Sequence, residues 1–526
     1  MKALAPALVA TALVLGVCGL AIGGLASGAT GYGVSLLDDP YILHALKFTL
    51  VQAMLSTLLS LALGAALALA RRHFPLRGLA ISALGAVFVL PSIVAVVSIV
   101  AVFGRSGFVN TVLQWFNTEQ RVSIFGLQGI LLAHVFFNAP LAARIFLNAL
   151  EAVPPTHWWL ARSLGFSPAQ VFTRLDWPAL RRSGPGAAGL IFILCATSFA
   201  IVLALGGGPQ SATLEVAIYE SLRFDFNLPR AASLAFLQSA LILMAFLVLE
   251  LGLSGTTQPE AHSDLLERSD RASIFTRLQD ALAFVLALAL LAGPIFATVI
   301  GTSPAKFLAV LQDPAFYRAL WGSLAIAVPA GLLAICLASA IAYGVAHVQI
   351  ALQRRTSARL LGASASLLLI LPPFALAAGL FIALRGLADP ARLAMPLVAL
   401  VNALTGLPIA LRIIGPPVLL NAERHGRLAA SLGVHGLTRL RLVDAPLLRA
   451  PLGLALATVI AFSIGDLGVA ALFGMGDVLT LPLYVYSLLG AYRVDQGGAA
   501  ALLLCGVILL LFLTIERLAK GRKQHA

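Results

Sequence analysis

Twelve long apolar runs constrain this chain more than any other feature of its sequence. A helix needs about 20 mostly apolar residues to cross the hydrocarbon core of a bilayer. Mean hydropathy is +0.97 and charged residues make up 11% of the chain, against about 25% in ordinary soluble domains, which excludes both a soluble core and a disordered chain. We therefore predict an all-α polytopic membrane protein with about twelve transmembrane helices, at residues 4–24, 46–70, 79–103, 130–147, 186–205, 231–253, 278–300, 320–345, 360–384, 395–414, 452–473 and 499–518.

The basic residues predict the orientation of these spans. Most of the 35 Lys and Arg residues lie in connections that share a side with both termini, and an excess of Lys and Arg marks the cytoplasmic side. Both termini are therefore expected in the cytoplasm, and the net charge of +13 needs no nucleic-acid partner to explain it. The first run could alternatively be a signal peptide, since Lys2 precedes it and small residues follow at 26–28.

One connection occurs twice. Residues 160–182 read LARSLGFSPAQVFTRLDWPALRR, and residues 428–450 read LAASLGVHGLTRLRLVDAPLLRA, with identities at a constant offset of 268 and no gap. A polar stretch at 254–273 separates the two copies. We predict two pseudo-symmetric six-helix modules, residues 1–253 and 278–526, joined by a cytoplasmic linker at 254–277.

Both copies connect the fourth and fifth spans of their module and are too long for a turn. Ala161 and Gly165 lie four residues apart, as do Ala429 and Gly433, so each pair shares one face of a helix. Small residues on that face leave room for another protein to pack. A loop that merely lies on the membrane surface is the alternative, and the duplication favours a docking element for a two-fold partner.

The pattern Ala-xxx-Gly, followed by Pro thirteen residues after the Gly, resembles the cytoplasmic signature of permeases of binding-protein-dependent ABC importers. The resemblance implies a bacterial inner-membrane subunit that docks two copies of an ATP-binding subunit and receives its substrate from a periplasmic binding protein. In that family a Glu usually precedes the Ala by two residues. Trp159 and Arg427 stand there instead, so the salt bridge of that Glu is not expected. The docking positions implied are Trp159, Ala161, Gly165, Leu175 and Pro178, and Arg427, Ala429, Gly433, Val443 and Pro446.

Longer stretches, at 197–215, 217–225, 462–473 and 480–486, are similar to the fused permeases of bacterial thiamine importers. This resemblance implies thiamine as the substrate, with transport of its phosphate esters left open. The fused ferric-iron permeases share the general layout and are the alternative.

Few acidic residues lie inside the apolar runs. Asp466 stands out, because a carboxylate in a bilayer normally faces a cavity or a partner. It either assists a cationic substrate or pairs with a structural donor; the sequence does not separate these roles. The other candidates for a substrate path are Ser198, Phe199, Glu215 and Tyr219.

Motifs of enzymes are absent from the sequence. It has no GxxxxGK[ST] loop for ATP, no HExxH, no GxSxG and no paired-Cys arrangement. We therefore expect no enzymatic activity, no bound cofactor and no metal, with ATP bound by the partner subunit. A twelve-span secondary transporter is a further alternative, but a one-chain transporter has no need of two docking loops. A membrane enzyme is a more distant one.

Overall fold

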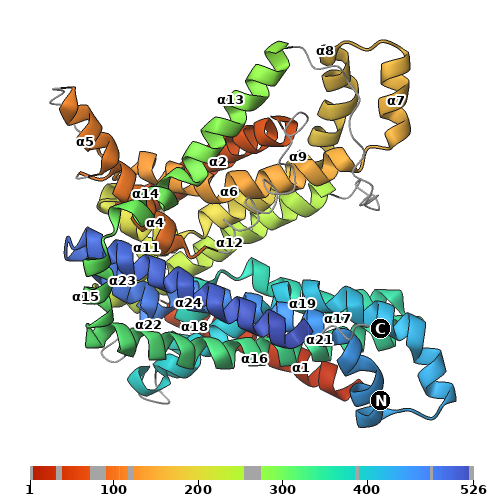
Figure 1. Cartoon of the computed structure of the whole chain (residues 1–526). Helices are drawn as coiled ribbons and strands as arrows, with labels where there is room; N and C mark the ends of the chain where they lie inside the picture. The colour runs from red at the N-terminus through yellow and green to blue at the C-terminus, as the bar shows by residue number, and fades with distance from the viewer. Residues whose placement is uncertain are drawn as a thin grey trace. The chain divides into compact units, whose positions relative to one another are not determined.

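The computed structural model describes residues 4–30, 38–70, 90–105, 107–116, 122–253, 274–385, 390–473 and 478–520. Every regular element within these ranges is a helix (Figure 1). The all-α membrane architecture predicted from the apolar runs is thus confirmed. The helices gather into two compact units, which take residues from both modules.

Unit 2 comprises residues 40–216 and 241–303. Its central packing joins α2, α6 and α9, and smaller helices extend from these three. The helices that lie wholly in it are α2 (Pro40–Ala70), α4 (Ser92–Phe103), α5 (Phe108–Trp115), α6 (Leu127–Glu151), α7 (Pro155–Ser163), α8 (Pro168–Val171), η3 (Phe172–Asp176), α9 (Trp177–Ala196), α10 (Phe199–Leu205), η4 (Pro209–Ser211), α13 (Ile274–Leu291) and α14 (Gly293–Gly301).

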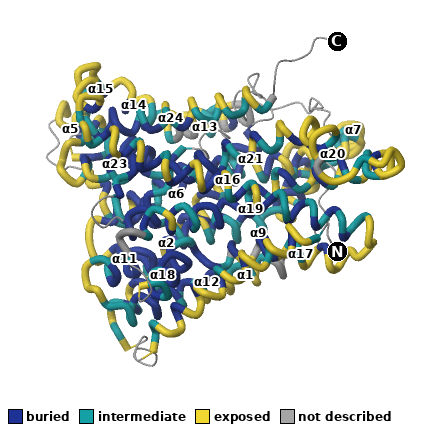
Figure 2. Tube along the Cα trace, turned by 90° about the horizontal axis from the view of Figure 1, so that it is seen from below, coloured by how far each residue is buried: buried dark blue, intermediate teal, exposed yellow. Residues whose placement is uncertain are grey.

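Unit 1 comprises residues 1–39, 217–240 and 304–526. Its centre is the packing of α16 against α19 and α21, and Figure 2 shows α16 and α19 buried over much of their length. Its helices are α1 (Ala5–Gly28), α15 (Pro304–Leu311), α16 (Pro314–Ile350), α17 (Arg355–Ile370), α18 (Pro373–Leu384), α19 (Pro390–Ser431), α20 (Gly436–Arg439), η5 (Leu440–Asp444), α21 (Ala445–Gly465), α22 (Gly468–Phe473), α23 (Leu481–Gly490) and α24 (Val494–Lys520). Two further helices, α11 (Leu214–Arg223) and α12 (Leu228–Leu253), have residues in both units.

The first helix of each predicted module packs on helices of the other module. In unit 1, α1 lies against α16, α17 and α18, and in unit 2, α13 and α14 lie against α2 and α4. Glycine permits the first contact, because a Cβ at Gly24 of α1 would collide with the carbonyl oxygen of Gly379 on α18. Small residues at such crossings let membrane helices approach closely. Most of the predicted linker, residues 254–273, lies outside the described residues, and the module boundaries stay a prediction.

The count of twelve spans is not confirmed. In the described residues nine helices are long and apolar enough to cross a membrane, or up to eleven if each of two bent pairs is one span. The expected ninth span, 360–384, is broken into α17 and α18 at Leu371 and Pro372. The expected third span, 79–103, is described only from residue 90, and α4 begins directly after Pro91. Both prolines are extended and precede the first residue of a helix, where the missing N–H costs nothing.

A second local arrangement also occurs twice. The backbone N–H of Leu214, the first residue of α11, donates to the Thr49 hydroxyl of α2 at 2.9 Å. The N–H of Leu481, the first residue of α23, donates to the Ser323 hydroxyl of α16 at 2.8 Å. Each buried hydroxyl satisfies one of the unpaired N–H groups at a helix start. The two modules therefore share polar contacts that sequence identity alone does not reveal.

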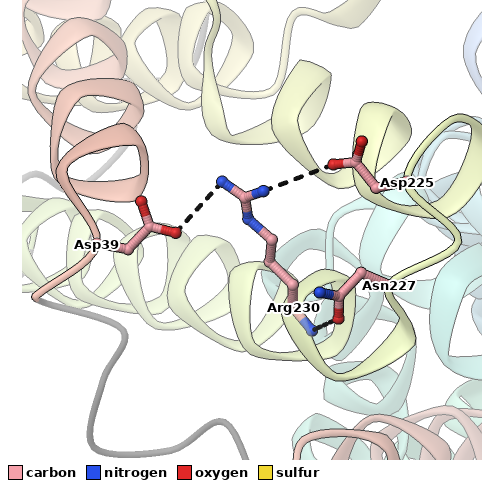
Figure 3. Close-up of polar contacts among 4 residues, drawn as sticks. All are labelled: Asp39, Asp225, Asn227 and Arg230. Carbon is pink, nitrogen blue, oxygen red and sulfur yellow. Dashed lines mark hydrogen bonds and ion pairs between the residues drawn. The ribbon is translucent and has the colours of Figure 1, made fainter.

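A charged cluster fixes the start of α12 in unit 1 (Figure 3). Arg230 lies 3.3 Å from a carboxylate oxygen of Asp39 and 3.5 Å from one of Asp225. The Arg230 backbone N–H also donates to the side chain of Asn227 at 3.1 Å. One guanidinium with five donors can hold two carboxylates in this way. It joins the segment before α2 to the turn between α11 and α12.

Candidate functional site

The two repeated connections fold alike to the residue. We call residues 155–178 the first loop and residues 423–446 the second loop. In the first loop α8 (labelled in Figure 1) is followed by the π-helical turn η3 and then by α9; in the second, α20 and η5 begin and end 268 positions later, and α21 begins 268 positions after α9. π-Helical turns are rare and occur mostly at functional sites. The constant offset found in the sequence thus corresponds to a repeated three-dimensional element.

Gly165 and Gly433 end the helices that enter the two loops. Both have φ +68°, and each donates its N–H to the carbonyl three residues back, at 3.1 Å in both loops. The next N–H, of Phe166 or Val434, donates to the carbonyl of Ala161 or Ala429 at 2.9 and 2.8 Å. This is the Schellman motif, which needs a left-handed residue, usually Gly. Both glycines are exposed, and a Cβ would meet nothing within 4 Å in either place.

The two alanines are buried beneath each loop. Ala161 and Ala429 are both only 4% exposed, so their small side chains allow close packing within the chain and do not form its surface. The other predicted docking residues are at least partly accessible. Trp159, Arg427, Gly165, Gly433 and Pro446 are exposed, and Leu175, Pro178 and Val443 are half-buried.

Four leucines outside the predicted docking positions contribute to the exposed apolar surface of the loops. Leu160 and Leu164 are 57% and 61% exposed, and their equivalents Leu428 and Leu432 are 59% and 69% exposed. Each pair is spaced by four residues and shares one helical face. Repeated apolar surface outside the spans is typical of a protein-interaction site. The constant offset could have identified these leucines, because it pairs both of them as identities.

The loops also differ in charge and local packing. In the first, the guanidinium of Arg174 lies 5.0 Å from the ring centre of Phe166, and Ser167 and Gln170 form a capping box at the start of α8. In the second, the equivalent of Phe166 is Val434, and that of Trp159 is Arg427. The backbone is therefore repeated while the surface chemistry is not.

A second pair of equivalent positions lies where the fifth span of each module breaks. α9 and α10 meet at a bend of 54°, with Ser198 before the first residue of α10. The equivalent position is Asp466, between α21 and α22. Its Oδ1 accepts the N–H of Gly468 at 3.1 Å, so the carboxylate caps the start of α22. The structural role weighed for Asp466 is thus present, while Oδ2 is buried and has no hydrogen-bond partner.

Buried polar side chains hold the helix ends at these breaks. In unit 2, the Gln52 amide donates to the carbonyl of Cys195 at 3.0 Å, and Asn138 donates to its Sγ at 3.2 Å. Ser56 and the Nδ1 of His134 lie 2.9 Å apart beside them. In unit 1 the corresponding contact is simpler, since Asn402 donates to the Ser463 hydroxyl at 2.9 Å. The bond from Gln52 satisfies a carbonyl that the broken helix frees, and the other three contacts join side chains beside the breaks.

The remaining path candidates occupy nearby elements of their own units. Phe199 is the first residue of α10 and is 5% exposed, and Glu215 lies in the first turn of α11 and is 2% exposed. Tyr219, in unit 1, contacts the ring of Phe224 edge-on. Among the described residues, no group of three or more His, Cys, Asp or Glu side chains is placed to hold a metal ion.

Relatives of this chain match it over most of its length. No protein-family model matches it. The thiamine transport system permease protein ThiP of Brucella melitensis is 38% identical over 510 residues, which are 95% of this chain and 92% of the relative. ThiP of Escherichia coli is 40% identical over 491 residues, 92% of this chain and 90% of the relative. ThiP of Haemophilus influenzae is 35% identical over 477 residues, 89% and 88% of the two chains.

Matches of this length include both loops and both helix breaks, so they cannot arise from one shared module. Together with the repeated fold, they establish that the chain belongs to the family of thiamine transport system permease proteins.

Proposed function

We propose that this chain is the membrane-spanning subunit of an ATP-driven importer and that its substrate is thiamine. The observation that carries the proposal is the extent of the likeness, because proteins named as thiamine transport permeases match 89% to 95% of the chain. The ferric-iron alternative has no such support. A secondary transporter is not favoured either, since it leaves the two loops without a purpose.

The two loops are the proposed attachment sites for two copies of an ATP-binding subunit. Each offers a pair of exposed leucines beside an exposed glycine, on a backbone that is the same in both loops. ATP is bound by that partner, since the sequence lacks a phosphate-binding loop. The loops lie on the cytoplasmic side in this proposal, and both termini lie there too. The membrane is the bacterial inner membrane, where a periplasmic binding protein delivers the substrate.

Asp466 is the proposed electrostatic partner of the cation. Its Oδ1 caps α22, and its buried Oδ2 accepts no hydrogen bond within the chain. A buried carboxylate with one unused oxygen can attract a positively charged ring without losing its structural bond. Ser198 at the equivalent break carries no charge, so the two modules contribute unequally to the substrate path.

Uptake into vesicles tests the substrate. The chain is reconstituted with the ATP-binding subunit and binding protein encoded beside it, and labelled thiamine and labelled ferric iron are supplied in separate experiments. Thiamine should accumulate only when both ATP and the binding protein are present. Accumulation of ferric iron without thiamine would contradict the proposed substrate, and uptake driven by an ion gradient without ATP would contradict the importer class.

A further inference from the structure

The second loop contains a buried carboxylate that ties it to a membrane helix. Asp444 ends η5 and is 4% exposed. The Asn421 amide of α19 donates to Asp444 Oδ1 at 2.7 Å, and Arg439 Nε lies 3.6 Å from Oδ2. His425 Nδ1 lies 3.0 Å from Asn421 Oδ1, and the Tyr343 side chain of α16 also interacts with Asp444. α20, η5 and α19 are thereby joined through one acidic side chain.

The first loop lacks the donors of this cluster. At the constant offset, Val153 stands where the second loop has Asn421, and Val171 where it has Arg439. Valine side chains cannot donate a hydrogen bond. Asp176, the equivalent of Asp444, is also buried and makes contacts of its own. The brace from the loop to the preceding membrane helix is therefore built differently in the two modules.

The helices that lead into the loops also differ between the two modules, and the difference again favours a firmer attachment of the second loop. α19 continues from Pro390 to Ser431, two residues before Gly433, and keeps its helical course through Pro416 and Pro417. In the first module α6 ends at Glu151, and α7 begins only at Pro155. An extended Pro154, with ψ 138°, separates them. The second loop is thus continuous with a membrane helix, whereas the first is attached through an interruption.

We propose that Asn421 and Arg439, acting through Asp444, are positioning residues that make the second loop the stiffer of the two and the main route for coupling. This inference rests on the proposed docking of an ATP-binding subunit at both loops. An ATPase can shift the permease only through contacts that differ between its states. A loop that continues a membrane helix transmits a displacement of the ATP-binding subunit to that helix. A loop that follows a break in the helix absorbs part of the displacement.

Substitutions that copy the first module test this asymmetry. Asn421→Val with Arg439→Val removes the donors but leaves a buried charge, which is destabilising. A triple variant with Asp444→Leu as well removes the buried carboxylate together with Asn421 and Arg439, so that no charge is left without its partners. Arg439→Lys keeps a positive charge beside Asp444, so this single variant should retain most of the coupling that the Val variants lose. Arg412→Val is the matched control, because it removes an exposed charge from the same helix outside the second loop.

Two measurements judge the variants. Amide hydrogen exchange on the full permease should be about tenfold slower in residues 436–444 than in residues 168–176, and the triple variant should abolish this difference. In the reconstituted complex, the triple variant should move about fivefold less thiamine per ATP hydrolysed, with the ATP-binding subunit still attached. Arg412→Val should leave both quantities unchanged.

Equal exchange in the two loops of the unmodified protein would overturn the inference, as would an unchanged thiamine-to-ATP ratio in the triple variant. Failure of the proposed function can be distinguished from failure of this inference. If the unmodified complex transports no thiamine, hydrogen exchange in the two loops can still be measured. That result alone then decides whether the second loop is the stiffer one.

Discussion

Two glycines set the geometry of the loops at the scale of single residues. Gly165 and Gly433 have φ +68° and are exposed, so Leu at either position meets no obstacle within the free permease. It costs about 1–2 kcal/mol of backbone strain, which a folded membrane protein should tolerate. Gly165→Leu with Gly433→Leu should therefore leave the spans folded and weaken attachment of the ATP-binding subunit.

The matched control for these variants is Asn at the same positions, because Asn adopts a left-handed backbone more readily than Leu. Pull-down of the ATP-binding subunit should rank the unmodified protein above the Asn variants, and those above the Leu variants. Full attachment of the ATP-binding subunit to the double Leu variant would show that neither glycine is part of the docking surface.

Asp466 is the second residue with a separable role. Asp466→Asn keeps an oxygen that can accept the Gly468 N–H but removes the charge. Thiamine uptake should fall while assembly of the complex is unchanged. Asp466→Ser, which copies Ser198, should reduce uptake as well. Normal uptake by both variants would leave Asp466 as a helix cap alone.

Residue by residue, the sequence was most informative where a feature occurs twice. The offset of 268 located both glycines and both buried alanines, whereas the equivalence of Ser198 and Asp466 emerged only from the helix breaks of the structure. It did not tell which side of each helix faces outward, so the alanines were selected and Leu160, Leu164, Leu428 and Leu432 were not. That choice depends on packing between helices, which periodicity in a short loop does not define.

At the scale of elements, the exposed leucines make each loop an interaction surface. Replacing Leu428 and Leu432 by Ser leaves the buried Ala429 in place. Burial of one Leu contributes about 1.5–3 kcal/mol, so losing two should weaken attachment by more than about tenfold. The affinity for the ATP-binding subunit is the measurement, and the equivalent pair in the first loop is the comparison. Undiminished affinity in both double variants would exclude the leucines from the interface.

The junction before α16 gives a pH-dependent prediction. The Tyr484 hydroxyl donates to Asp313 Oδ2 at 2.7 Å, and this bond, with the Ala315 N–H and nearby arginines, holds the pKa of Asp313 below its ordinary value against the opposing effect of burial. A lowered pKa stabilises the fold above the unfolded-state pKa of about 3.9, and the stabilisation is lost as pH falls through the lowered value.

Tyr484→Phe should therefore lower the melting temperature of the purified permease at pH 7, and the difference from the unmodified protein should shrink toward pH 3. Tyr317→Phe, which removes a hydroxyl from an exposed side chain of α16, is the matched control. A difference that stays constant with pH would show that Asp313 is not the linked group.

Elements were predicted best where apolar length alone defines them. The spans at α1, α2, α6, α12, α16 and α24 follow directly from their apolar runs. The break between α17 and α18 was not expected, because the apolar run continues through Leu371 and Pro372 and hides it. The packing of α1 on α16 and α18 could not be predicted either, since it depends on contacts between segments more than 280 residues apart in the sequence.

At the scale of the whole molecule, one duplicated backbone serves two tasks, attachment of the ATP-binding subunit and passage of the substrate. The backbone is repeated in the two loops, at the starts of α11 and α23, and at the prolines before α4 and α18. The side chains differ at the helix breaks and in the bracing of the second loop. A repeated backbone suits a partner that is itself present twice, and unequal side chains suit a substrate without two-fold symmetry.

The most direct test is ATP-dependent uptake of labelled thiamine by vesicles that contain this chain, its ATP-binding subunit and its binding protein. The unmodified complex should accumulate thiamine, and the complex with both Gly165→Leu and Gly433→Leu should not, although its spans remain folded. Equal accumulation by the two complexes would contradict the claim that the repeated loops couple ATP hydrolysis to transport.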